Sequence, residues 1–163
     1  GCVVACSMEG SRPLMVEIQA LICHSSFGIP RRQATGTDYN RVNLLMAVLE
    51  KRVGIQVNSC DAYLNIAGGI KITEPAVDLG MVMAIISSFR NKPIDEKMVV
   101  FGEVGISGEV RAVSMAQQRV LEAKKLGFTT CILPKSCADS LTDKSGIRII
   151  GITNIQEAIE VMS

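Results

Sequence analysis

The chain has 163 residues, which suits one domain, and 48% of them are hydrophobic against 20% charged, which excludes a disordered protein. Its 17 basic and 16 acidic residues give a net charge of +1, which excludes a strong, uniform nucleic-acid field but not a local basic patch. With no Trp and an aromatic fraction of 4%, the sequence also argues against base-stacking platforms for single strands.

The first third of the chain predicts two strands, a polar loop and a helix. A short apolar run at residues 2–7 and the alternation of apolar and polar residues at 14–23 are typical of strands. Residues 24–37 are polar and contain glycine and proline, which predicts a loop. Asp38 should cap a helix that runs to about Val53, because apolar side chains recur there at helical spacing.

The middle of the chain predicts a strand and a buried helix. Residues 61–67 are typical of a strand, and Thr73-Glu74-Pro75 favours a helix start because proline suits the first turn and an acid suits the N-terminal dipole. Asp78 is the only charged residue in the apolar run at residues 76–86. We therefore expect a central helix in which Asp78 is a hydrogen-bonded structural carboxylate rather than the remnant of a site.

The last part of the chain predicts a hairpin followed by short elements. Residues 99–104 and 109–113 are typical of two strands joined by the glycine-containing turn at 105–108. Ser114 should cap the next helix, which should end at Gly127. The remaining predicted elements are strands at residues 129–133 and 147–150 and a final helix with Thr153 and Gln156 as its capping box. The alternation of strands and helices predicts one mixed α/β domain.

The cysteines and glycines form no recognisable metal or nucleotide motif. The six cysteines contain no C-x-x-C pair and His24 is the only histidine, so we expect reduced thiols rather than zinc ligands. A catalytic pair of Cys23 with His24 is disfavoured, because adjacent side chains on a strand point to opposite faces. The glycines at 102, 105 and 108 fit neither a P-loop nor a dinucleotide fingerprint. We expect no metal or nucleotide cofactor in this domain.

The location of the protein is predicted from what its sequence lacks. The apolar runs are too short to span a bilayer and no signal peptide opens the chain, so we expect a cytoplasmic protein with no membrane partner. The first residue is Gly1 rather than Met, and we interpret residues 1–163 as a single domain excised from a longer chain.

Two segments resemble Lon protease. Residues 73–78, at the start of the apolar helix, are similar to the Lon segment that carries the nucleophile, and residues 101–110 resemble the Lon hairpin with its repeated Gly-Glu-Val. The resemblance implies an α/β (α+β) fold of the Lon proteolytic-domain type, which is ribosomal protein S5 domain 2-like: a mixed sheet with packed helices and a hairpin.

The resemblance also implies that the catalytic positions of Lon are vacant here. The Lon serine falls on Ala76 and the Lon lysine falls on Gln117. Alanine has no nucleophilic atom, and a glutamine amide is not basic at neutral pH. Ser87 and Ser88 are better explained as serines within a helix than as substitute nucleophiles. We therefore expect no enzyme activity in this domain.

The whole chain resembles the C-terminal domain of the RadA/Sms family of bacterial DNA recombination and repair proteins. The resemblance implies a hexameric ring in which a zinc finger and a RecA-like, DNA-dependent ATPase precede this domain, so ATP, Mg and Zn are expected only there. The domain itself is implied to scaffold the ring and to help hold DNA. The alternatives are a serine peptidase domain and a protein-interaction module. The stretches that carry the resemblance are residues 9–14, 19–21, 25–32, 34–36, 38–41, 49–52 and 68–69.

One basic group is the candidate DNA-binding site. At about 100° per residue, Arg41 and Arg52 should lie on the same flank of their helix. The group could contact the phosphate backbone, but a solvated face or salt bridges across a subunit interface would use the same residues. The candidate DNA-binding residues are Arg31, Arg32, Arg41, Lys51 and Arg52.

Overall fold

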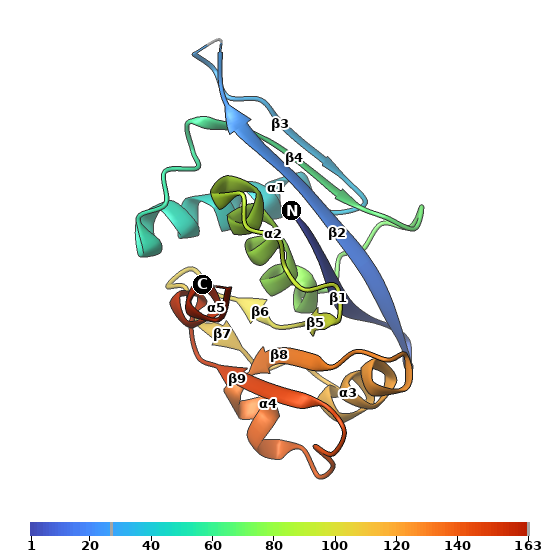
Figure 1. Cartoon of the computed structure of the whole chain (residues 1–163). Coiled ribbons are helices and arrows are strands. Elements are labelled where there is room, and N and C mark those ends of the chain that lie inside the picture. The colour runs from blue at the N-terminus through green and yellow to red at the C-terminus, as the bar shows by residue number, and fades with distance from the viewer. Residues whose placement is uncertain (27, 163) are drawn as a thin grey trace.

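A seven-stranded mixed sheet in the order β3-β4-β2-β1-β5-β8-β9 forms the core of the protein (Figure 1). The structure of the protein is a computed structural model that describes residues 1–26 and 28–162. The antiparallel pairs join β1 (Cys2–Glu9) to β2 (Arg12–His24) and β2 to β4 (Cys60–Ile66). The parallel pairs join β3 (Arg32–Thr35) to β4, β1 to β5 (Met98–Val100), β5 to β8 (Thr130–Pro134) and β8 to β9 (Arg148–Ile152).

Helices cover both faces of this sheet. Alternation along β1 sends Val3 and Ala5 into a core with α2 (Asp78–Arg90), and sends Cys6 into a second core with α3 (Ala116–Lys125). Helix α2 is buried along almost all of its length, as its apolar sequence predicts. The helices α1 (Tyr39–Val48) and α5 (Ile155–Met162) pack on α2, and α4 (Lys135–Ser140) packs on β8 and β9.

The predicted mixed α/β class is confirmed, but two short elements were not predicted. Strand β3 lies inside the predicted polar loop, and α4 follows β8 without a periodic pattern of its own. Both depend on neighbours that are distant in sequence, because β3 exists through parallel pairing with β4. Phe27, in the same predicted loop, lies outside the described residues.

The predicted hairpin is divided between two sheets. Strand β5 ends at Val100, the chain leaves the main sheet, and β6 (Glu103–Val104) then pairs antiparallel with β7 (Val110–Arg111). The backbone of Gly102 makes this exit. Its amide donates to Ala76 O (2.8 Å) and its carbonyl accepts from Leu79 N (3.1 Å). The hairpin is thereby fixed to the start of α2.

The helix caps confirm two predictions and correct two others. Asp38 accepts from Asn40 N (2.9 Å) before α1, and Gly127 follows α3 with a left-handed φ of +92°. Ser114 does not cap α3, because Met115 occupies that position with a φ of +59°. Before α5, Asn154 Oδ1 accepts from Glu157 N (3.0 Å), so the capping pair is shifted one residue from the predicted Thr153 and Gln156.

A substitution at Gly36 tests how closely the chain after β3 approaches the end of β4. Gly36 has a φ of +81°, and a Cβ built there would lie 2.6 Å from the carbonyl oxygen of Ile66. Gly36→Ala should therefore lower the free energy of unfolding by about 2–4 kcal/mol, since it combines backbone strain with a backbone clash. Gly10→Ala is the control, because Gly10 also has a positive φ of +61° but nothing lies within 4 Å of its Cβ position. It should cost only about 1 kcal/mol in urea denaturation, and equal losses would contradict the packing argument.

Candidate functional site

The buried carboxylate of Asp78 joins three elements at the start of α2. Its side chain is 1% exposed. Its Oδ1 accepts from Arg41 Nε (3.0 Å), and its Oδ2 accepts from Arg41 Nη2 and from Val104 N (3.1 Å). This hydrogen bonding raises the pKa of Arg41. The expected hydrogen bonding of the Asp78 carboxylate is confirmed, and its assignment as a structural group rather than the remnant of a site stays a prediction.

The two positions of the predicted vacant dyad have different surroundings. Ala76 is buried in the 3-10 turn η2 (Pro75–Val77) and lines a cavity of about 260 Å³ with Ser114 and Arg119. Gln117 on α3 does not line this cavity. Its Nε2 donates to Asp143 O (3.0 Å), and its Oε1 accepts from Thr142 N (2.8 Å). The glutamine therefore holds the loop after α4, and neither position offers a nucleophile or a base.

Arg119 is a buried cation that the sequence analysis missed. It is 1% exposed and donates to Ser114 O (3.0 Å), to Cys6 O (2.8 Å) and to Glu74 Oε1 (2.7 Å). Its guanidinium also lies 5.5 Å from the centroid of the Phe101 ring. Nothing in the local sequence distinguishes it from Lys124 and Lys125, the other cations of α3. These bonds tie α3, β1 and the turn that carries Ala76 into one frame.

Ser87 and Ser88, the alternative nucleophiles, both make hydrogen bonds to the backbone of neighbouring segments. Ser88 Oγ accepts from Ile22 N (2.9 Å), and Ser87 Oγ donates to Lys92 O. Each serine therefore fastens the end of α2 to a neighbouring segment, as expected for serines within a helix.

Three of the buried thiols, Cys6, Cys131 and Cys137, lie in the same core, on the face of the sheet that α3 covers. Cys2 and Cys23 are exposed and the other four cysteines are buried; burial raises the pKa of Cys6 to about 11. Within residues 1–26 and 28–162, His, Cys, Asp and Glu side chains form no group of three or more that could hold a metal ion. In the same part of the chain, no helix is both long and apolar enough to cross a bilayer.

The five candidate cations differ in their exposure to solvent. Arg41 is held by Asp78 and also donates to Val104 O (3.0 Å). Arg32 is half-buried, and its guanidinium donates to Met46 Sδ (2.7 Å) and to Asn58 O (2.8 Å). The exposed members are Arg31, Lys51 and Arg52. The side chains of Arg41 and Arg32 are thus structural, while the exposed three remain candidates for phosphate contact.

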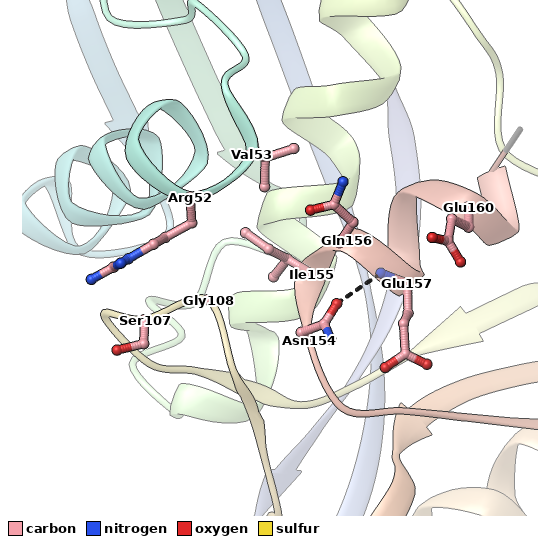
Figure 2. Close-up of a pocket in the computed structure, with 9 residues that line it drawn as sticks. All are labelled: Arg52, Val53, Ser107, Gly108, Asn154, Ile155, Gln156, Glu157 and Glu160. Carbon is pink, nitrogen blue, oxygen red and sulfur yellow. Dashed lines mark hydrogen bonds between the residues drawn. The ribbon is translucent and has the colours of Figure 1, made fainter.

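The shared flank of Arg41 and Arg52 faces the hairpin. Arg52 Nε donates to Ile106 O (3.4 Å), two residues beyond the carbonyl that Arg41 contacts. Arg52 stands at the end of the π-helical turn η1 (Leu49–Val53), beside a cavity of about 440 Å³. Figure 2 shows its guanidinium directed away from Glu157 and Glu160 on the opposite wall. The terminal nitrogens of Arg52 are thus not neutralised by these carboxylates.

A network brings Arg32 close to the same turn. Asn58, whose carbonyl accepts from Arg32, donates through Nδ2 to Glu50 Oε2 (2.6 Å) in η1. The start of β3 and the end of the first helix therefore lie together. The pair Arg31-Arg32 and the pair Lys51-Arg52 therefore lie on neighbouring segments.

Comparison with known proteins shows where this chain belongs. Residues 20–137 match the family described as subunit ChlI of Mg-chelatase. DNA repair protein RadA of Bacillus subtilis is 55% identical over 159 residues, and DNA repair protein RadA of Halalkalibacterium halodurans is 54% identical over 161. The chain belongs to the ChlI family, in the form found in DNA repair protein RadA. The predicted resemblance to RadA is confirmed.

The relatives are longer than this chain. DNA repair protein RadA of Listeria monocytogenes, for example, is 47% identical over 160 residues, which are 98% of this chain but 35% of that protein. The same 35% holds for the relatives from B. subtilis and H. halodurans. The chain therefore spans about a third of the length of these RadA proteins.

The bond network around Asp78 predicts which arginine supports the fold. Arg41→Ala should lower the free energy of unfolding by about 3–5 kcal/mol, because it leaves a buried carboxylate without its cation. Arg52→Ala should change it by less than about 0.5 kcal/mol, since Arg52 is exposed and makes one long hydrogen bond. Urea denaturation of both variants measures the difference. Equal stabilities would show that Arg41 is not the structural cation.

Proposed function

We propose that this chain is the non-catalytic, Lon-like domain of a RadA-type DNA recombination and repair ATPase, and that it serves ring assembly and DNA binding. The observation that carries the proposal is the absence of a serine at position 76 and of a lysine at position 117, in a fold whose neighbouring elements are joined by buried hydrogen bonds. Ala76 and Gln117 have no catalytic atoms, yet Asp78 and Arg119 hold the elements around them with buried, charge-assisted hydrogen bonds. The names of the relatives support a role in DNA repair.

The fold class and the wider assembly follow as parts of the same proposal. The mixed sheet, the divided hairpin and the 3-10 turn at Ala76 support a Lon-type, ribosomal protein S5 domain 2-like fold. ATP, Mg and Zn would be bound by the parts of a RadA-type protein that this chain does not span, and the assembly would be a cytoplasmic hexameric ring. This domain would need no cofactor of its own.

The proposed DNA contact is made by exposed cations. Arg31, Lys51 and Arg52 lie on neighbouring segments and are exposed, and long basic side chains of this kind bind phosphate oxygens without reading bases. Arg32 and Arg41 orient the segments that carry them. Binding should therefore be independent of sequence and should weaken as salt rises.

Removing the exposed cations tests this site. The triple variant Arg31→Ala, Lys51→Ala, Arg52→Ala should weaken binding of a fluorescent duplex at low salt by roughly tenfold or more, and should make the salt slope less negative by about 2–3, because three phosphate contacts are lost. The matched control, Lys124→Ala, Lys125→Ala, Lys135→Ala, removes the same charge from α3 and α4 and should bind as the unaltered protein does. Equal losses in both variants would assign binding to net charge and not to this site.

The absence of catalysis is tested separately. Incubation of the chain with labelled casein should release no peptides, because Ala76 and Gln117 supply neither nucleophile nor base. The variant Ser87→Ala, Ser88→Ala serves as the background control. Turnover that co-purifies with the chain would overturn the non-catalytic part of the proposal, and turnover lost in the double variant would identify a substitute nucleophile.

A further inference from the structure

Strand β3 forms one edge of the seven-stranded sheet, and its outer side has unpaired backbone groups. Ala62 N donates to Arg31 O (2.8 Å), and β3 runs parallel to β4 in this register. Successive residues of a strand direct their N–H and C=O groups to alternate sides. Gln33 therefore bonds to β4, while the backbone groups of Arg32 and Ala34 point outward. Within the described residues, those outward groups have no hydrogen-bond partner.

The chain itself already uses the next position on this outer side. The carbonyl of Gly36, which is in phase with Arg32 and Ala34, accepts from Ile72 N (2.7 Å). This bond closes one end of the edge and leaves the rest open, as the outermost position of β3 in Figure 1 illustrates. A hollow of about 780 Å³, lined by residues 34–37 and 65–71, continues from the open part. Ile70 in its wall is 53% exposed.

The residues that form this edge and line the hollow carry a net positive charge. One acidic side chain stands at the start of the strand, where Asp61 Oδ1 accepts from Arg31 N (2.7 Å). Residues 31–37 and 65–71 contain three cations, Arg31, Arg32 and Lys71, and no Asp or Glu. The whole chain, in contrast, is nearly balanced, with 17 basic and 16 acidic residues. A segment that approaches this edge therefore meets a local positive potential that the chain as a whole does not have.

We propose that the outer edge of β3 binds an extended, acidic polypeptide segment by strand addition. An added strand supplies both donors and acceptors, which is what the outward N–H and C=O groups of Arg32 and Ala34 require. The phosphate groups of a nucleic acid only accept, so its phosphate backbone does not satisfy the outward C=O groups of this edge. The edge of a second copy does not suit it either, because pairing would bring together two sets of Arg31, Arg32 and Lys71. The proposal does not depend on the DNA site.

Amide exchange on this chain gives the direct test. The probe is a synthetic peptide of about ten residues in which Val and Glu alternate, a length typical of a strand. When it is added, exchange at the amides of Arg32 and Ala34 should slow by roughly tenfold or more, while Gln33, already bonded to β4, should change little. The same peptide with Lys in place of Glu should bind at least about tenfold more weakly because of the local positive charge.

A backbone substitution provides the second arm. Ala34→Pro removes an outward N–H that the sheet does not use, which an edge strand tolerates, and it should weaken peptide binding by about tenfold or more. Gln33→Ala keeps every backbone group and should bind as the unaltered chain does. If Ala34→Pro unfolds the protein, the exchange measurement on the unaltered chain decides.

Three results would overturn the proposal. They are unchanged exchange at Arg32 and Ala34 with peptide present, equal binding of the Lys peptide, and equal slowing of these two amides by duplex DNA. Self-association that protects the same amides without any peptide would replace the peptide by a second copy.

Discussion

A carboxylate at the start of an almost completely buried helix is the constraint on which much of this structure depends. Burying a carboxylate such as that of Asp78 in an apolar core is costly unless its lone pairs are satisfied and a cation is close. Arg41 from α1 and the amide of Val104 from β6 meet that demand. One group thus fixes the first helix, the central helix and the hairpin relative to one another. The exit of the chain at Gly102 strengthens the same junction through backbone bonds to Ala76 and Leu79.

Because of this constraint, the backbone around Ala76 is held in place by residues other than those at the two predicted catalytic positions. The turn with Ala76 sits between two buried ion pairs, Arg41–Asp78 and Arg119–Glu74, so its geometry is held independently of any catalytic side chain. Gln117 has become a support for the loop at Thr142 and Asp143. With no nucleophile or base at Ala76 and Gln117, we propose that the domain acts through its surfaces. The exposed cations Arg31, Lys51 and Arg52 and the open edge of β3 are the surfaces that we propose.

The sequence predicted most of the long elements, because their buried faces produce a periodic pattern of apolar residues. The first helix, the central helix and the early strands were predicted this way. Strand β3 has only four residues and depends on pairing with β4, so it carried no local signal. The division of the hairpin at Gly102 was missed because its apolar run continues through Phe101 and depends on contacts with the distant start of α2.

The site was predicted in part. The vacancy at Ala76 and Gln117 rests on the resemblance to Lon and stays a prediction, and the basic group was recognised from its composition. What the sequence could not reveal was the use of each cation. Arg41 and Asp78 lie 37 positions apart in the sequence, and Arg119 and Cys6 lie 113 apart. Only the folded structure therefore shows that these two arginines make hydrogen bonds within the protein.

Chemical-shift mapping of the labelled chain with a short DNA duplex tests the central claim most directly, because it reads every surface in one experiment. The claim is that function has moved from the dyad positions to the exposed surface. The account predicts shifts concentrated at residues 31–32 and 51–52 that diminish as salt rises, with the amides of Ala76 and Gln117 unmoved. Shifts centred on the cavity at Ala76, or spread evenly over all cationic segments, would contradict it.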